Sequence, residues 1–253
     1  MIGIFDSGSG GLTVLRAIRK EMPSANIVYF ADLAHAPYGS KSRGELTLLT
    51  LSAIERLQTF GASRVVSACN SVSASLVVSL YDTLFETPNA LVEMVGPTVS
   101  AFRGSNKKIL LCATEATIHS EMYQNGFRMI GEEIQSLAIP LLAGAIESGT
   151  SHSEIKEIIR RSLEGVSIHD ITTVILACTH YPLAIKQFQE CLPPSVVLYD
   201  PAVAVARRVK KWWWPQEVGD GSMTFLLSKD SLVFREFLAD FFPNDEYHVT
   251  VVD

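Results

Sequence analysis

The sequence predicts an α/β fold with mainly parallel sheets, built as two similar α/β domains. Three observations support this prediction. Short apolar runs alternate with longer segments of helical periodicity, which indicates strand–helix–strand units with parallel strands. The apolar runs are nearly continuous, as in strands that are covered on both faces. Finally, one pattern of strand and cysteine occurs twice in the 253 residues, a length that suits one or two compact domains.

The expected strands are runs rich in Val, Ile and Leu. They are Ile2–Phe5, Ile27–Phe30, Val65–Ala68, Leu91–Val95, Ile109–Cys112, Val174–Ala177, Val196–Tyr199 and Thr224–Leu227. The expected helices mostly follow glycine, serine or other polar residues of the kind that begin helices. They are Leu12–Glu21, Arg43–Phe60, Ser73–Phe85, Ser153–Leu163, Ala202–Lys211 and Ser231–Phe242.

The repeated pattern predicts two related halves. Residues Val65–Asn70 and Val174–Thr179 both consist of an apolar run, then Ala, then Cys, then a small polar residue. A weaker similarity relates Ile2–Asp6, with the glycine-rich turn after it, to Ile109–Thr114. Any two buried strands share apolar residues, so the duplicated Ala-Cys ending is the specific part of the pattern.

Composition and charge exclude several classes of protein. The net charge is −6 and no long basic run occurs, which argues against a nucleic-acid partner. No run of 18 apolar residues exists, which argues against a transmembrane helix. The first residues lack the pattern of a secretory signal. We therefore expect a cytoplasmic protein whose four cysteines are free thiols.

The segment Asp6–Gly11 is a glycine-rich turn between a predicted strand and a predicted helix. Such a turn presents backbone N–H groups at a helix N-terminus, where an anion is stabilised. It lacks the Gly-Lys-Ser/Thr of a phosphate-binding loop, and Thr13 replaces the third glycine of a dinucleotide fingerprint. Asp32 does lie where a ribose-binding acid would be expected. Asp6 and Ser7 nevertheless favour a small polar ligand, and a tight turn without a ligand is the alternative.

Two cysteines have polar neighbours at a predicted strand end, unlike the usual apolar core cysteine. Cys69 precedes Asn70, and Cys178 lies two residues before His180, whose imidazole can exchange a proton with a thiol. A zinc site would need about four ligands, and no second close pair accompanies Cys178 and His180, so no metal is expected. A cysteine hydrolase needs a single nucleophile, and the matched setting of the two thiols argues against it. For either cysteine alone, a buried structural thiol is the alternative.

Other conspicuous residues have simpler interpretations. Cys112 and Cys191 lack polar neighbours of this kind, and we expect them to pack in the core. The run Trp212–Trp214 precedes a proline and is expected to end a helix and to pack on the core or on a partner. His35 is expected to be a solvated loop residue.

Together these motifs resemble those of the glutamate racemases, in the aspartate/glutamate racemase superfamily. The resemblance covers nearly the whole chain and rests on Asp6–Gly8 with Gly10–Leu15, Pro37–Gly39, Ala68–Asn70, Ala113–Ile118 and Cys178–Leu183. In aspartate-acting relatives an acid usually follows Cys-Thr, so His180 favours glutamate. Three positions depart from the family: Ser9 stands where valine is common, Ser71 where threonine is usual, and Val72 where a small residue is usual.

The resemblance implies an enzyme that interconverts L- and D-glutamate with no cofactor, and specifically no pyridoxal phosphate, and that supplies D-glutamate for peptidoglycan. It implies a first domain of residues 1–93 plus 207–253 and a second of residues 94–206, with the active site between them. A homodimer is compatible with it. Cys178 would act on L-glutamate and Cys69 on D-glutamate. Asp6 would assist Cys69, while His180 and Glu147 would assist Cys178. The implied substrate-binding residues are Asp6, Ser7, Tyr38, Gly39, Asn70, Ser71, Thr117, Thr179 and His180.

Two alternatives stay open from the sequence. One is a racemase or isomerase that acts on aspartate or another small acid. The other is a non-catalytic protein of the same fold that binds an amino acid and has a regulatory role.

Overall fold

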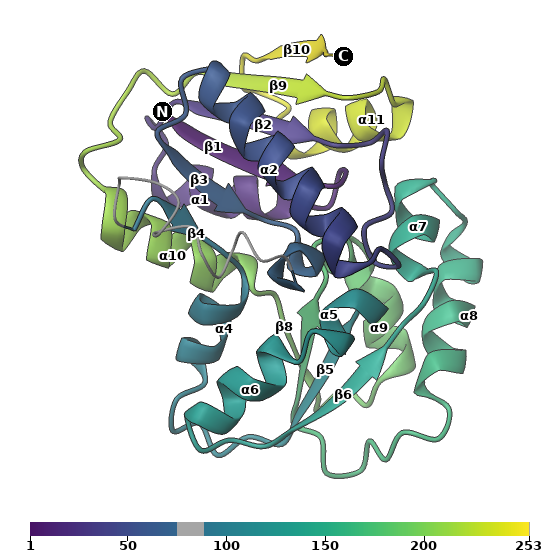
Figure 1. Ribbon diagram of the computed structural model, residues 1–253. Helices are drawn as coiled ribbons and strands as arrows, with labels where there is room; N and C mark the ends of the chain where they lie inside the picture. Colours follow the sequence, from purple (N-terminus) through teal and green to yellow (C-terminus); the bar gives the residue numbers. More distant parts are fainter. Residues whose placement is uncertain (75–88, 253) are drawn as a thin grey trace.

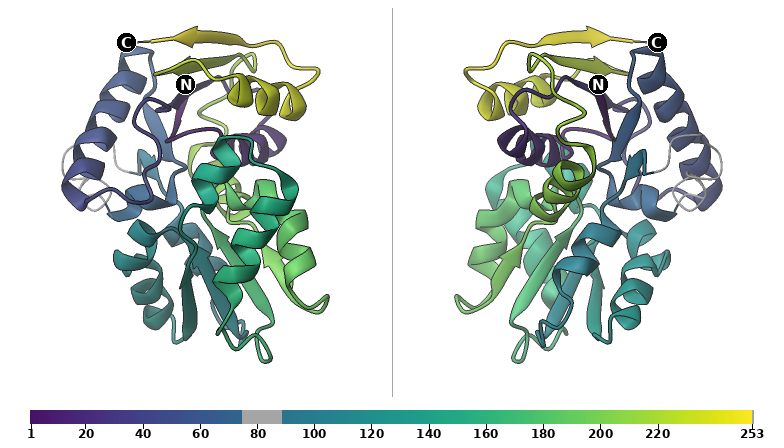
Figure 2. Two further views of the ribbon diagram at one scale, coloured as in Figure 1. Left: turned by 90° about the vertical axis from the view of Figure 1, so that its right-hand side faces the viewer. Right: turned by 90° about the vertical axis from the view of Figure 1, so that its left-hand side faces the viewer.

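The structure is a computed structural model that describes residues 1–74 and 89–252. Its strands form two separate sheets, and Figures 1 and 2 show them in two lobes, one above the other. Strand neighbours within each sheet are parallel throughout. The predicted α/β fold with mainly parallel sheets is therefore confirmed.

The first sheet has six strands in the order β10-β9-β2-β1-β3-β4. These are β1 (Ile2–Asp6), β2 (Ile27–Ala31), β3 (Arg64–Ser67), β4 (Leu91–Val92), β9 (Met223–Leu227) and β10 (His248–Val251). The second sheet has four strands in the order β6-β5-β7-β8. These are β5 (Ile109–Ala113), β6 (Ile134–Ala138), β7 (Thr173–Ala177) and β8 (Val197–Tyr199).

Helices cover both faces of each sheet (Figures 1 and 2). The helices among the described residues are α1 (Leu12–Glu21), α2 (Arg43–Thr59), α4 (Val95–Ala101), α5 (Glu115–His119), α6 (Met122–Met129), α7 (Leu142–Glu147), α8 (His152–Leu163), α9 (Ile185–Cys191), α10 (Ala202–Trp213) and α11 (Leu232–Phe241). Two 3-10 turns, η1 (Asn70–Ala74) and η2 (Tyr181–Ala184), follow the strands that precede Cys69 and Cys178.

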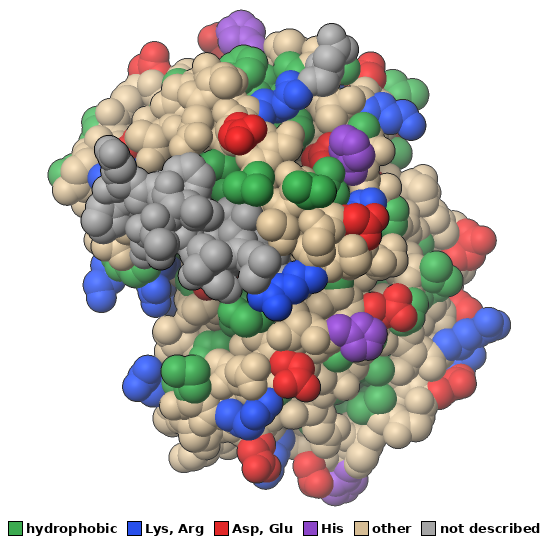
Figure 3. All heavy atoms as spheres, in the orientation of Figure 1, with side chains coloured by type: hydrophobic (Ala, Val, Ile, Leu, Met, Phe, Trp, Pro, Cys, Tyr) green, Lys and Arg blue, Asp and Glu red, His purple; other side chains and the backbone are tan. Residues whose placement is uncertain are grey.

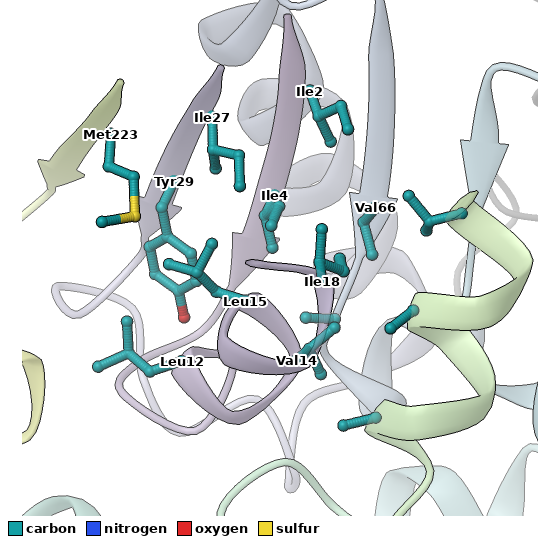
Figure 4. Packing of buried hydrophobic residues seen from close by; sticks show 14 of the residues in the cluster. Ile2, Ile4, Leu12, Val14, Leu15, Ile18, Ile27, Tyr29, Val66 and Met223 are labelled. Carbon is teal, nitrogen blue, oxygen red and sulfur yellow. The ribbon is translucent and has the colours of Figure 1, made fainter. Parts of the chain in front are cut away.

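Alternation along the central strands divides each lobe into two apolar cores. Ile4 of β1 packs with α1 on one face of the first sheet, whereas Phe5 packs with α2 on the other face. Figure 4 shows the first of these cores, where side chains of β1, β2 and α1 meet. Each fully buried aliphatic side chain of this kind stabilises the fold by about 1.5–3 kcal/mol. Two-sided burial explains why these strands are apolar at every position.

Parallel register brings the polar strand ends of each sheet to one edge. Phe5 of β1 pairs with Ser67 of β3, so Asp6 and the residues after Ser67 leave the first sheet side by side. In the second sheet Ala113 pairs with Ala177, so Thr114 and Cys178 also leave together. Carboxyl ends of parallel strands are where α/β folds place ligand contacts.

Most predicted elements are confirmed, with four differences. Helices α4, α5, α6, α7 and α9 were not anticipated, because each has eight residues or fewer and so shows little helical periodicity. Strands β6 and β10 were not anticipated, because they are edge strands whose side chains are largely solvent-exposed or half-buried and therefore lack a continuous apolar run. The predicted strand Leu91–Val95 is too long, since only Leu91–Val92 is extended. Glu93 accepts hydrogen bonds from the N–H groups of Val95 and Gly96, the first two residues of α4, and so favours the start of that helix. Apart from its first two residues, which belong to η1, the predicted helix Ser73–Phe85 lies outside the described residues.

The proposed division of the chain at residue 207 would cut a helix. Helix α10 runs without a break from Ala202 to Trp213, and both Val205 and Val209 are buried in the core of the first sheet against α1. We therefore propose that the chain returns to the first domain near Pro201. Trp213 ends α10, is buried and donates from Nε1 to the carbonyl of Asn89, so the expected helix end and core packing are confirmed for this residue. Trp214 packs against the same core while half-buried, whereas Trp212 is exposed.

Surface charge and helix hydropathy complete the description of the fold. On the face shown in Figure 3, acidic and basic side chains are interspersed among the described residues. Across residues 1–74 and 89–252, no helix is both long and apolar enough to cross a bilayer.

Candidate active site

A cavity of about 600 Å³ lies between the two sheets and is lined by both halves of the chain. The first half contributes Ser7, Tyr38, Gly39, Cys69, Asn70 and Ser71, and the second contributes Thr114, Glu147, Cys178, Thr179 and His180. Much of the remaining wall is apolar and includes Leu33, Pro37, Ile139 and Leu141, with Ser40, Glu115 and Ser148 as further polar residues. Both candidate thiols therefore face one space.

Cys69 lies directly beyond β3, where Ala68 still donates its N–H to the carbonyl of Phe5. Its side chain is 5% exposed, and its thiol donates to Ser7 Oγ over 3.8 Å. Burial, together with the nearby Asp6 and Cys178, raises the pKa of Cys69 to about 12. Cys69 is thus a protonated thiol at neutral pH, able to give a proton rather than to take one.

Cys178 has a different set of partners. Its thiol is 6% exposed and lies 4.0 Å from Nδ1 of His180, whose Nε2 is 2.5 Å from Oε2 of Glu147. Burial alone would lower the pKa of His180, but its hydrogen bonds to Cys178 and Glu147 raise that pKa well above its usual value. Burial would raise the pKa of Glu147, yet the hydrogen bonds from His180 and Ser9 bring it below its usual value. The result is a relay of thiol, imidazole and carboxylate.

Asp6 lies beside the cavity rather than on its wall. It is fully buried and accepts hydrogen bonds from the Gly8 N–H at 2.9 Å and from Thr179 Oγ1 at 3.0 Å. Burial raises its pKa, and the nearby His180 offsets part of that rise. Because Thr179 belongs to the second half, this buried carboxyl also ties the two halves together next to Cys69.

Asn70 carries a buried side-chain donor that has no partner among the described residues. Tyr123 donates to Oδ1 of Asn70 at 2.6 Å, which fixes the amide, while Nδ2 is buried and unpaired among the described residues. A buried unpaired donor is costly, and a ligand with an acceptor oxygen would relieve that cost. Asn70 is therefore placed to bind a carboxylate.

Hydroxyl groups form a second polar patch across the interface. Ser71 Oγ is 2.9 Å from Thr114 Oγ1, which in turn is 3.0 Å from Thr117 Oγ1. Thr114 and Ser71 line the cavity, whereas Thr117 is fully buried behind Thr114. Sequence reasoning named Thr117 and missed Thr114, although Thr114 follows β5 as the glycine-rich turn follows β1.

The loop after β2 presents Tyr38 and Gly39 to the cavity. Asp32 holds this loop, because it accepts from Tyr38 Oη at 2.5 Å and is 2.8 Å from Nδ1 of His35. Its carboxylate is thus occupied within its own loop rather than free for a ribose. Gly39 is in close contact with Thr114, and a Cβ at Gly39 would lie 2.9 Å from that side chain. His35 is 58% exposed, as expected of a solvated loop residue.

The remaining cysteines are apart from this site. Cys112 is fully buried in the core of the second sheet, and burial raises its pKa to about 12. Cys191 is half-buried at the end of α9. The described residues hold no cluster of three His, Cys, Asp or Glu side chains arranged to bind a metal ion.

Two thiols from two α/β lobes, each with its own acid–base neighbours and both lining one cavity, define a class of protein that moves protons at a small bound molecule. Comparisons with known proteins narrow this class. The family model for Asp/Glu/Hydantoin racemase matches residues 12–209. The glutamate racemase of Cereibacter sphaeroides is 34% identical over 247 residues, which cover 90% of each chain.

Solved structures agree with the sequence comparison. The structure of a glutamate racemase from Bacillus anthracis superposes with a TM-score of 0.86 at 26% identity, covering 100% of this chain and 97% of that one. The glutamate racemase from Thermus thermophilus, solved with β-chloro-D-alanine, gives a TM-score of 0.83 at 30% identity and covers 100% and 96%. The chain belongs to the Asp/Glu/Hydantoin racemase family.

Proposed function

We propose that this protein interconverts L- and D-glutamate without a cofactor, by proton transfer through Cys69 and Cys178. One observation carries the proposal: each thiol follows a strand of a different sheet, and both line the same cavity. A racemase must remove the α-proton from one face of the substrate and return a proton to the other. Two lobes that each contribute one thiol suit that task, and the similarity to glutamate racemases supports glutamate as the substrate.

The reaction from L-glutamate begins with Cys178 as the base. Its thiolate takes the α-proton, so the C–H bond breaks, an S–H bond forms and the electron pair stays on the α-carbon and its carboxylate. Cys69 then gives its thiol proton to the opposite face, which forms D-glutamate and leaves a Cys69 thiolate. Proton exchange with solvent resets the two thiols. From D-glutamate the roles are reversed.

The two thiols need unequal help in this reaction. A free thiol has a pKa of about 8.5, so a thiolate at neutral pH requires a partner. His180, held by Glu147, takes up the Cys178 proton over the 4.0 Å between Nδ1 and Sγ. Cys69 has Ser7 and the backbone of Val72 as hydrogen-bond partners, and in this proposal it stays protonated until the carbanion-like intermediate forms.

Neutral donors hold the substrate carboxylates in this proposal. The described wall of the cavity contains no Lys or Arg side chain, so amide and hydroxyl groups must do this work. The unpaired Nδ2 of Asn70 and the hydroxyls of Ser71 and Thr114 form one group of donors. Donors aimed at the carboxylate also stabilise charge that moves onto it when the α-proton leaves.

The cellular role follows from the reaction. We propose that the enzyme works in the cytoplasm, where its four free cysteines stay reduced, and that it supplies D-glutamate for peptidoglycan.

The test is circular dichroism of L- and D-glutamate with the purified protein. We expect the wild type to drive either enantiomer toward the racemate, and Cys69→Ala or Cys178→Ala to abolish this while the protein stays folded. Cys191→Ala, at the half-buried end of α9, is the matched control and should racemise normally. Full activity in either active-site variant would rule out the two-thiol mechanism.

Two further assays distinguish the proposed function from its alternatives. A panel of aspartate and other small acids reveals a different substrate by its rate of racemisation. A non-catalytic binding protein would bind glutamate without bringing solvent deuterium into the α-position.

A further inference from the structure

Ser9 contacts the relay of Cys178 from the other half of the chain. It lies in the glycine-rich turn between β1 and α1, and its side chain is fully buried. Its backbone N–H donates to Oε2 of Glu147 at 2.9 Å, and its hydroxyl donates to the same oxygen at 2.8 Å. His180 is the third partner of that oxygen, at 2.5 Å.

The charge of Glu147 is stabilised through this one oxygen. Its other oxygen, Oε1, is buried and has no hydrogen-bond partner among the described residues. The glycine-rich turn can lie this close to Glu147 because Gly8 has no side chain: a Cβ at Gly8 would lie 2.5 Å from Oε2 of Glu147. A buried carboxylate with one bare oxygen depends strongly on every donor to the other oxygen.

We propose that Ser9 is a positioning residue, whose hydroxyl holds Glu147 ionised and aligned with His180 so that the relay can serve Cys178. The inference rests on the proposed racemisation and adds to it a residue that acts through Glu147 rather than on substrate. Valine, which is common here in the resembling family, would keep the backbone donor and lose the hydroxyl.

The direction in which the pKa of Glu147 moves when the Ser9 hydroxyl is removed follows from the protonation states of Glu147 and His180. Removing the hydroxyl destabilises every state in which Glu147 is ionised, whether His180 is protonated or not. The pKa at which Glu147 gains its proton therefore rises, while the pKa of His180 is unchanged to first order. The other titratable groups that face Glu147 are Asp6 of β1 and Tyr29 of β2, and neither contacts the Ser9 hydroxyl.

The experiment compares Ser9→Val with Ser9→Thr, which have the same shape and differ only in the hydroxyl. Carbon-13 NMR of glutamate-labelled protein, with the Glu147 signal assigned by Glu147→Gln, follows the carboxyl as pH falls. One charge-assisted hydrogen bond corresponds to about one pH unit, so the Glu147 midpoint should rise by about that much in Ser9→Val and stay near wild type in Ser9→Thr. The acid limb of kcat/KM for racemisation should move by the same amount, with the basic limb unmoved.

Four results distinguish the possible failures. Coincident Glu147 midpoints in the two variants would overturn the proposal, as would equal loss of activity in both at unchanged thermal stability. A shifted carboxyl midpoint with an unmoved acid limb would overturn its catalytic part. If the wild type does not racemise glutamate, the proposed function fails, while the NMR comparison still decides whether Ser9 holds Glu147 ionised.

Discussion

Gly10 lies where the backbone of the first half comes close to the backbone of His180 in the second half, so Gly10→Ala tests how that close approach supports catalysis. A Cβ at Gly10 would lie 2.6 Å from His180 Nδ1 and Thr179 Oγ1, and 2.7 Å from the backbone nitrogen of His180. A flexible side chain could move aside, but a backbone atom moves only with its segment. The substitution must therefore push the turn after Cys178 away from the first half.

The structure sets the size of the effect. Ordinary contact for a Cβ begins at 3.4 Å, so the His180 backbone has to retreat by roughly 0.7 Å. A misplacement of about 1 Å at a catalytic centre costs about 100-fold in rate. We expect kcat/KM to fall by about 10- to 100-fold, which corresponds to about 1.4–2.7 kcal/mol of transition-state stabilisation. Overpacking should also cost about 1–3 kcal/mol of folding stability.

The assay is racemisation of both enantiomers by circular dichroism, well below the melting temperature of the variant. L- and D-glutamate have equal free energies in solution, so kcat/KM must fall equally in the two directions. Gly44→Ala is the matched control, because a Cβ there meets no atom within 4 Å. Gly44 lies in the first turn of α2, and the change should leave activity intact and stabilise the helix by about 0.5–1 kcal/mol. If Gly10→Ala were as active as Gly44→Ala, close packing at the relay would not be what positions His180.

Three further predictions concern single groups. In Asp6→Asn the pKa of Cys69 should fall below its value of about 12, because a neighbouring negative charge is removed, although burial still keeps the pKa high. Titration of thiolate absorbance in the ultraviolet measures this pKa, and an unchanged titration curve would contradict the prediction. In Glu147→Gln the pKa of His180 should fall, because Cys178 alone then opposes the effect of burial, and kcat/KM should drop by about 100-fold. NMR of the imidazole and steady-state kinetics report the two effects, and an unchanged imidazole titration would contradict the relay. Cys112→Ala should lower the free energy of unfolding by about 1 kcal/mol and leave racemisation unchanged, measured by chemical denaturation and circular dichroism; a large loss of activity would show that this core thiol takes part in catalysis.

Sequence reasoning succeeded where burial is two-sided and failed where it is not. The central strands β1, β5 and β7 are apolar at nearly every position, and each was found within a residue or two. The edge strand β6 carries Gln135 and Ser136 toward solvent, so neither continuous apolarity nor alternation marked it. Helix α7 has only six residues, too few for a periodic pattern.

Within the site, residues in local motifs could be predicted from the sequence, whereas contacts between distant segments could not. The two cysteines stood out because each lies in a local motif after a strand, and the structure brings them to one cavity. The hydroxyl of Ser9 meets Glu147 across 138 positions of sequence. No local pattern could reveal that contact, because it exists only where two lobes with separate cores face each other.

The most direct test of two thiols acting from two sides is racemisation of L-glutamate in deuterium oxide, stopped early and analysed for isotope at the α-carbon of each enantiomer. We expect the D-glutamate that forms to carry deuterium, because its new α-hydrogen comes from Cys69, whose thiol has exchanged with solvent. The remaining L-glutamate should be largely unlabelled. D-glutamate that retained the original α-proton would mean that one base carries the proton from face to face, and it would contradict the account.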